Sequence, residues 1–374
     1  MKSSIGSEAR FIPVAQPVLC GNEKKYVNEC LDSSWISSAG KFISQFEEAF
    51  AAFCGTRYAI SSNNGTTALH LALLGLNAGP GDEVLVPTLT YIASANAIRY
   101  CGARPVLIDS EPLTMNIDPL AIERRITPAT KGIVVVHLYG HPADMDPILE
   151  IARRHNLFVI EDAAEAHGAT YRGRTVGSMG DVATFSFFGN KIITTGEGGM
   201  LTTNRPDLND RIRLLRGQGM DLKRRYWFPI VGYNYRMTNI EAALGLAQLE
   251  RVEEHLDRRE AVAGWYNRHL SDLSNFITLP SVMDWAHHVF WMYTILLKDS
   301  CQVSRDELMA RLMERGIETR PVFYPMHAMP PYLDTQSHYP VADALSARGI
   351  NLPTHGLLSE DDVQYIATQI RSCL

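Results

Sequence analysis

The sequence predicts an α/β protein in which a large, mostly parallel sheet is followed by a smaller α+β domain. Between Tyr58 and about Asn204, short apolar runs such as EVLV, KGIVVVHLY and LFVIED alternate with helical stretches, a pattern typical of βαβ units covered on both faces. From about Glu250 the pattern changes to a long helix followed by mixed strands and helices. We therefore expect an N-terminal arm and large domain at 1–250 and a second domain at 251–374.

Composition restricts the classes of protein to which the chain can belong. Hydrophobic residues make up 46% and charged residues 20%, which is ordinary for a globular protein, and no apolar run approaches the ~20 residues of a membrane helix. We expect no membrane span. A net charge of −6 argues against a nucleic-acid surface, which needs a basic field. Six cysteines without C-x-x-C spacing and a start without a signal-peptide core favour the cytoplasm.

The remaining elements follow in chain order. Prolines disfavour regular structure up to about residue 20, and a helix is predicted from Glu23 to Leu31. A single long helix is predicted from Thr238 to Asn267, because leucine, alanine and valine recur there at helical spacing. A strand at Phe290 to Leu297 and a helix at Arg305 to Arg315 belong to the second domain.

The stretch from Asp181 to Met200, DVATFSFFGNKIITTGEGGM, places one lysine between an aromatic strand and a glycine-rich turn. Lysine is strongly hydrated and is rarely buried, so Lys191 at this position indicates a chemical function. A partly desolvated lysine amine can form a Schiff base with an aldehyde such as that of pyridoxal phosphate. The alternative is a lysine at a strand end whose ammonium reaches water.

Two upstream segments contain the other groups that such a cofactor needs. Asp162 ends the run LFVIED at the carboxyl end of a predicted strand, where an acid can partner a protonated ring nitrogen. Asp109 ends its own strand in the same way, and the residues alone do not separate the two. Gly65, Thr66 and Thr67 open a helix whose free N–H groups and hydroxyls can hold a phosphate, although an ordinary capped helix has the same pattern.

No metal site is predicted. His137 and His141 in HLYGHPADMD look like ligands, but Gly140 and Pro142 interrupt any helix that would place both on one face. No further histidine or cysteine nearby completes a zinc set.

Seven motifs in a fixed order extend this pattern over nearly the whole chain. They are SNNGTTALHLAL, GDEVLVPTLTYIASANAI, HLYGHPADMDPI, FVIEDAAEAHGA, FSFFGNKIITTGEGGM, GYNYRMTNIEAALGLAQL and ETRPVFYPMHAMPPY. The chain resembles the pyridoxal phosphate-dependent sugar nucleotide aminotransferases of fold type I, from about Phe11 to the last helix. The resemblance implies pyridoxal 5′-phosphate as cofactor, L-glutamate and a nucleotide-linked keto sugar as substrates, and a homodimer with shared active sites.

The resemblance also implies roles for single residues. Lys191 is the implied catalytic amine, and Asp162, in the matching motif DAAEAHGA, is the implied partner of the ring nitrogen. Tyr91 would stack on the pyridine ring, although an aromatic residue there is more often part of the core. Ser186 would bind the cofactor phosphate, unless it is only a buried hydroxyl. Asn234 would come from the second subunit and complete the phosphate site.

Two departures from the wider family pattern stand out. Many relatives carry glutamine or histidine where this chain has Glu165, whose anion would oppose the negative phenolic oxygen of the cofactor; Glu165 is therefore protonated or makes a different contact. Many relatives also carry histidine and proline shortly before the lysine, where this chain has Phe188, Gly189 and Asn190. The run FFGNK is shared with a subgroup that aminates C4 of GDP-4-keto-6-deoxy-D-mannose. Some dehydratase relatives replace the lysine with histidine, and Lys191 argues against that reaction.

Four residues are candidates for substrate binding, each with a structural alternative. Trp35 lies in a loop that is beside the active site in relatives, and plain packing is the alternative. Arg225, in KRRYWF, suits a pyrophosphate, and a solvated charged face is the alternative. Arg320 would meet the carboxylate of the amino donor or a phosphate, and His327 follows in the same motif; structural ion pairs are the alternative for both.

The expected reaction is transfer of the amino group of L-glutamate to C4 of a 4-keto-6-deoxy nucleotide sugar. Subgroup likeness favours a GDP-linked sugar. UDP- or dTDP-linked sugars, or a pyridoxal phosphate-dependent sugar dehydration, are the alternatives. O-antigen and lipopolysaccharide biosynthesis is the setting that the resemblance implies, and the destination of the product stays open.

Overall fold

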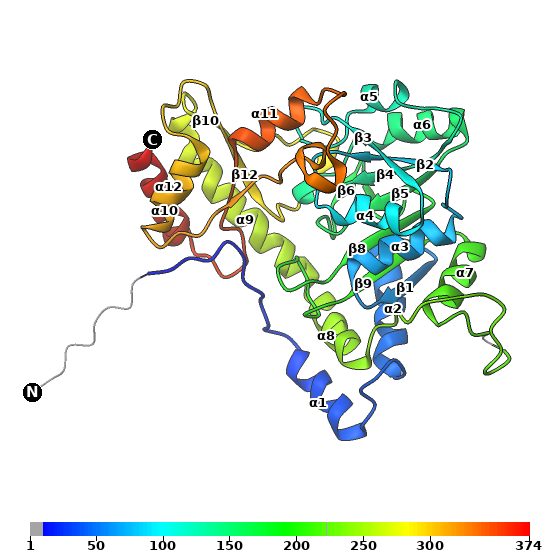
Figure 1. Ribbon diagram of the computed structural model, residues 1–374. Coiled ribbons are helices and arrows are strands. Elements are labelled where there is room, and N and C mark those ends of the chain that lie inside the picture. Colours follow the sequence, from blue (N-terminus) through cyan, green and yellow to red (C-terminus); the bar gives the residue numbers. More distant parts are fainter. Residues whose placement is uncertain (1–9, 222) are drawn as a thin grey trace, which may run out of the picture.

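The computed structural model describes residues 10–221 and 223–374, so residues 1–9 of the expected N-terminal arm lie outside the described part. Its central feature is a mixed sheet of seven strands, in which β9 alone runs antiparallel to its neighbours (Figure 1). The predicted α/β fold with a mostly parallel sheet is confirmed. In spatial order the strands are β1 (Tyr58–Ser62), β9 (Gly199–Thr203), β8 (Val182–Ser186), β5 (Phe158–Asp162), β4 (Thr130–Val136), β2 (Glu83–Pro87) and β3 (Arg104–Ile108).

Helices cover both faces of this sheet, because alternate strand residues point to opposite sides. In β2, Val84 and Val86 join one buried apolar cluster, whereas Leu85 joins the other. The first cluster includes residues of α2 (Lys41–Cys54), α3 (Gly65–Gly75), α4 (Ala93–Tyr100) and α7 (Pro206–Arg216). The second includes residues of α5 (Pro119–Glu123) and α6 (Met145–His155).

The predicted long helix from Thr238 to Asn267 is two helices, and in this respect the prediction is wrong. The start is right, since Thr238 caps α8 (Asn239–Leu249) by a reciprocal pair of hydrogen bonds with Glu241. The chain then leaves helical geometry at Arg251 and resumes as α9 (Val252–Leu270). Glu250, at the break, accepts hydrogen bonds from Asn22 and Tyr26, so tertiary contacts hold a turn where the apolar spacing alone predicts continuation.

The C-terminal part has its own sheet and apolar core. Its strands lie in the order β10 (Ile277–Thr278), β12 (Tyr293–Leu297), β14 (Gly349–Leu352) and β13 (Arg320–Pro321). The expected strand begins three residues late, because Phe290 has a φ of 47°, which no regular strand accepts. The core joins this sheet to α9 and to α10 (Arg305–Met313) and α12 (Glu360–Cys373).

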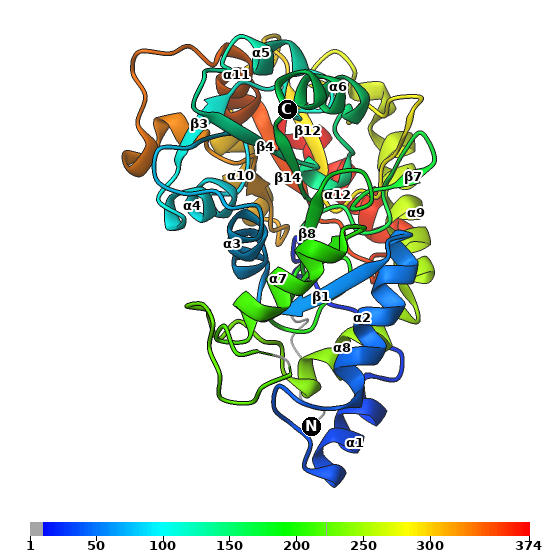
Figure 2. The same cartoon turned by 90° about the vertical axis from the view of Figure 1, so that its right-hand side faces the viewer.

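The remaining elements are peripheral. A small sheet joins β11 (Ala286–His287), β6 (Thr170–Tyr171) and β7 (Arg174–Thr175), and α11 (Pro340–Arg348) lies beside the C-terminal sheet. Helix α1 (Glu23–Ser33) projects at the end of the molecule opposite α5 and α6 (Figure 2). The two main sheets fall on either side of residue 250, and the domain boundary itself stays a prediction. Among the described residues, no helix combines the length and apolarity that a membrane crossing requires.

Candidate active site

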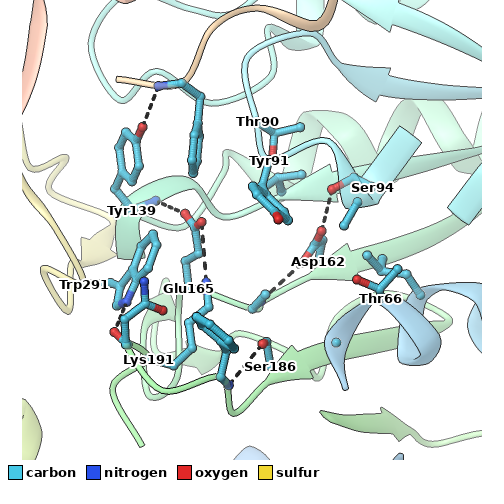
Figure 3. A pocket seen from close by; sticks show the side chains of 18 of the residues that line it. Thr66, Thr90, Tyr91, Ser94, Tyr139, Asp162, Glu165, Ser186, Lys191 and Trp291 are labelled. Carbon is cyan, nitrogen blue, oxygen red and sulfur yellow. Dashed lines mark hydrogen bonds and ion pairs between the residues drawn. The ribbon is translucent and has the colours of Figure 1, made fainter. Parts of the chain in front are cut away.

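A pocket of about 490 Å³ lies where the carboxyl ends of the large-sheet strands meet the C-terminal sheet (Figure 3). Val136 and Asp162 end β4 and β5, and Ser186 ends β8; all three line it. The C-terminal part contributes Arg320 and Asn351 among others. Ligands of α/β sheets bind at this edge, so the topology itself indicates a site.

Lys191 enters the pocket from the connection between β8 and β9. This connection is closed at its base by the pairing of Ser186 with Gly199, and the Lys191 N–H donates to the Phe188 carbonyl at 2.9 Å. The Lys191 Nζ lies 3.7 Å from Glu165 Oε1 and 3.8 Å from the centre of the Trp291 ring. The amine predicted from sequence to have a chemical function therefore faces the pocket, and its side chain is only 11% exposed.

Burial lowers the pKa of Lys191, and the negative charges of Glu165 and Asp162 oppose that effect. A lowered pKa makes the neutral amine more accessible near neutrality. Neutral amine is the form that attacks an aldehyde or accepts a proton.

Asp162 lies in the same pocket as a buried carboxylate. Its Oδ2 accepts a hydrogen bond from the Ser94 hydroxyl at 2.6 Å (Figure 3), and its Oδ1 accepts one from the Ala164 N–H at 3.3 Å. Burial raises the pKa of Asp162, while these two hydrogen bonds and the Lys191 charge favour the anion. The carboxylate is thus fixed in place for a cationic partner.

Asp109, which the residues alone could not separate from Asp162, has a different role. Its carboxylate accepts hydrogen bonds from the N–H groups of Val341 and Ala342 at the start of α11, at 3.2 and 2.9 Å. It therefore caps a helix and does not line the pocket.

Glu165 is buried beside the lysine. Its Oε2 accepts a hydrogen bond from the Tyr139 N–H at 2.8 Å. Burial raises the pKa of Glu165 to about 7, against the opposing effects of the Lys191 charge and the Tyr139 hydrogen bond. Both the protonated and the ionised forms are therefore accessible near neutral pH.

The start of α3 forms an anion cradle at the other end of the pocket. Asn64 caps the helix. Its side-chain oxygen accepts a hydrogen bond from the backbone N–H of Thr67, and the Thr67 hydroxyl accepts one from the backbone N–H of Asn64. Within the described residues, the N–H groups of Gly65 and Thr66 have no protein acceptor. Free N–H groups at the positive end of a helix can bind an anion. The Thr67 hydroxyl lies within hydrogen-bond distance of Asn63 Oδ1 and of the Asn64 carbonyl, to which it can donate. It therefore contributes less to this cradle than the sequence suggested.

Gly65 is required sterically at this point. A Cβ added to it would lie 2.8 Å from the Ser186 Cβ, closer than real carbon atoms approach. Ser186 therefore lies directly against the start of α3, and its role as a phosphate ligand stays a prediction.

The other predicted contacts divide into two groups. Tyr91 lies two residues before α4 begins and lines the pocket with an exposed ring. Arg320 also lines the pocket, and its Nη2 lies 3.7 Å from Glu318 Oε1. Trp35, Arg225 and Asn234 are exposed and lie outside the pocket of their own chain.

His327 also lies outside the pocket. It is buried, its Nδ1 lies 2.8 Å from the Thr88 hydroxyl, and its Nε2 lies 3.0 Å from Asp343 Oδ1. The ring of Tyr339 stacks on the imidazole. These contacts fit the structural alternative stated for His327.

Several pocket residues were missed from the sequence, and three of them contact the predicted ones. Ser94 follows Tyr91 in TYIAS, and its small hydroxyl at a strand-to-helix turn was the available signal. Tyr139 precedes Gly140 and has a φ of 56°, a conformation that only the fold reveals. Trp291 is 100 positions from Lys191, and no local pattern connects them. Among the described residues there is no cluster of three potential metal ligands.

The groups in this pocket fit pyridoxal 5′-phosphate. An amine, a buried carboxylate and a helix start with two free N–H groups lie in one cavity, and an added Cβ would close the anion cradle. These match the aldehyde, ring nitrogen and phosphate of that cofactor.

Comparison with known proteins agrees with this geometry. The GDP-perosamine synthase of Caulobacter vibrioides is 61% identical over 369 residues, which cover 98% of this chain and all of that protein. The GDP-perosamine synthase of Escherichia coli O157:H7 is 51% identical over 361 residues, covering 96% and 98%. The solved structure of Spr1654 from Streptococcus pneumoniae in its PLP form aligns with a TM-score of 0.91 at 28% identity, covering 98% and 100%.

Residues 18–371 match the sequence profile of one aminotransferase family, so the match covers the large sheet, the pocket and the C-terminal sheet. The chain belongs to the DegT/DnrJ/EryC1/StrS aminotransferase family, and its cofactor is pyridoxal 5′-phosphate.

Proposed function

We propose that this chain transfers the amino group of L-glutamate to C4 of GDP-4-keto-6-deoxy-D-mannose and so forms GDP-perosamine. The observation that carries the proposal is the 61% identity over the full length of a GDP-perosamine synthase. A pocket with a buried amine and carboxylate supports it independently. A UDP- or dTDP-linked sugar is the second candidate, and dehydration is disfavoured because Lys191 is retained.

When bound, pyridoxal phosphate supplies an aldehyde that carries the amino group and a ring that withdraws electrons from the reacting carbon. Lys191 is the proposed covalent attachment point. With the cofactor bound, its released Nζ would move a proton from Cα of glutamate to the aldehyde carbon. In the second half-reaction it would move a proton from that carbon to C4 of the sugar. The low exposure of Lys191 and Asp162 limits the access of water to both transfers.

The surrounding residues orient the reacting groups. Asp162, positioned by Ser94, is the proposed partner of the protonated ring nitrogen. Gly65, Thr66 and Ser186 are proposed to hold the phosphate, with a lesser contribution from Thr67. Tyr91 has an exposed ring in the pocket that is suited to stack on the cofactor.

Glu165 and Arg320 complete the proposed site. In its protonated form Glu165 can donate a hydrogen bond to the phenolic oxygen, where an anion would be repelled. Arg320 is a cation in the wall of the pocket, 3.7 Å from Glu318, and is proposed to bind the carboxylate of glutamate.

We infer that the protein is a homodimer with shared active sites. Asn234, Arg225 and Trp35 are solvent-exposed and outside the pocket of their own chain, which suits residues that complete the partner's site. A set of large apolar side chains near Arg225 is also exposed, and a second copy would cover it. It comprises Tyr226, Trp227, Phe228 and Val231. Light scattering on the purified protein, with a monomer as the refuting result, tests this inference.

The deciding assay offers the purified protein L-glutamate and, separately, the GDP-, UDP- and dTDP-linked 4-keto-6-deoxy sugars. Amination of the GDP sugar, detected by mass, with stoichiometric 2-oxoglutarate is the expected result. Amination of another nucleotide sugar in its place would refute the GDP assignment. Sugar turnover without 2-oxoglutarate would refute transamination.

We place the reaction in the cytoplasm, because the cysteines are unpaired thiols.

A further inference from the structure

The indole ring of Trp291 forms one wall of the pocket directly against the reactive amine (Figure 3). The Lys191 Nζ lies 3.8 Å from the centre of the ring, within the range in which an ammonium is attracted to an aromatic face. Trp291 itself is only 4% exposed. The contact is therefore shielded from solvent, and it is stronger than the same contact at a surface.

Two contacts hold the ring in this position, and a third holds the backbone of Trp291. Its N–H donates to the Asn190 carbonyl at 2.8 Å, which ties it to the residue before the lysine. The Trp291 carbonyl accepts a hydrogen bond from the buried guanidinium of Arg259 at 3.1 Å, and the same nitrogen donates to Thr354 at 2.8 Å. The ring of Tyr139 stacks at 6.1 Å with an angle of 26°. The ring cannot turn away from the lysine without breaking its hydrogen bond to the Asn190 carbonyl and its stacking on Tyr139.

The ring differs from the other groups that face the lysine. Glu165 and Asp162 are titratable, and burial raises the pKa of Glu165 to about 7, so its charge changes near neutrality. His167 carries little charge there, because burial lowers its pKa to about 3. The attraction of the indole face for an ammonium does not depend on pH.

We propose that Trp291 is a positioning residue that holds the ammonium of Lys191 against its ring whenever the lysine is released from the cofactor. This inference rests on the proposed function of Lys191 as the proton carrier. The ring stabilises the protonated amine and keeps Nζ beside the reacting carbon between the two proton transfers. Loss of the ring lowers the pKa of Lys191 and reduces kcat, with little effect on the KM for glutamate.

Two variants and a control separate this role from simple packing. Trp291→Leu removes the ring. A tetrafluorinated tryptophan at position 291 keeps the shape and the N–H and removes the negative potential of the ring face. Trp285→Leu is the matched control, because the indole of Trp285 packs on His141 and Tyr171, outside the pocket.

The measurement uses protein loaded with pyridoxamine phosphate, in which Lys191 is free. The rate of acetylation of Lys191 by acetic anhydride is followed against pH by peptide mass spectrometry, with the exposed Lys131 as internal reference. We expect the pKa of Lys191 to fall by about one unit in both position-291 variants and to stay unchanged in the control. The fluorinated protein retains the packed shape, so it carries the test even if Trp291→Leu does not fold.

An unchanged pKa of Lys191 in the fluorinated protein overturns the inference, and so does an equal shift in the Trp285→Leu control. Failure of the proposed function has a different signature. In that case the unaltered protein would not convert glutamate to 2-oxoglutarate, whatever the acetylation profile of Lys191.

Discussion

Replacement of Glu165 by glutamine should remove a pH-dependent loss of stability in the cofactor-free protein. Burial raises the pKa of Glu165 from its ordinary value of 4.5 to about 7. Glutamine keeps an oxygen that can accept the Tyr139 N–H and cannot ionise. The variant therefore tests the environment of this one carboxyl group.

The sign and size of the effect follow from the pKa. A raised pKa favours the protonated folded state, so its stabilising contribution is complete below pH 4.5 and is lost as the pH rises to about 7. The difference of about 2.5 pH units corresponds to about 3 kcal/mol, at 1.36 kcal/mol per unit. Above pH 7 the carboxyl is ionised in both states, and the loss stays constant.

Urea unfolding of the two proteins at several pH values between 5 and 8 measures this effect. Other buried groups also make stability depend on pH in this range, among them His141 and His355, whose pKa falls from 6.5 to about 4 on burial. They are common to both proteins, so the difference between the two unfolding free energies reports Glu165 together with its ion pair to Lys191. We expect the free energy of unfolding of the variant to increase relative to that of the unaltered protein as the pH rises to 7. A difference that is flat, or that falls with pH, would refute the reasoning.

Three further changes have definite expected outcomes. Lys191→Ala should abolish both the absorbance change on adding pyridoxal phosphate and turnover; full activity would contradict the proposed function. Gly65→Ala should weaken cofactor binding at least tenfold in an equilibrium titration, because its Cβ would lie 2.8 Å from the Ser186 Cβ, and unchanged binding would contradict the anion cradle. Phe46→Ala, at a side chain with no solvent exposure, should cost about 3–5 kcal/mol in urea unfolding, and a loss below about 1 kcal/mol would contradict its place in the core.

Much of the fold was predictable because local patterns determine it. Alternating apolar runs and helices place the parallel strands, and the capping pattern at Thr238 fixes a helix start. The break at Glu250 and Arg251 was not predictable, because contacts from α1 hold it and the apolar spacing continues through it. The late start of β12 has a similar cause, a left-handed backbone at Phe290.

The pocket was predictable where chemistry requires a particular residue type. Lys191 and Asp162 carry such a requirement, and the structure places both in one cavity. No such chemical requirement identifies Trp291 in the sequence, because its contacts come from residues spread over the chain. The residues alone did not distinguish Asp162 from Asp109. The matching motif DAAEAHGA did, and the structure gives the physical reason, because Asp109 caps a helix outside the pocket.

The closed base of the connection between β8 and β9 has a consequence for evolution. Ser186 pairs with Gly199, so the sheet is complete without the residues between them. Phe187, Ile192 and Ile193 in this connection belong to the buried core, whereas Lys191 does not. A change of Lys191 alone can therefore delete the amine, and with it the reaction, while the sheet and its core still form.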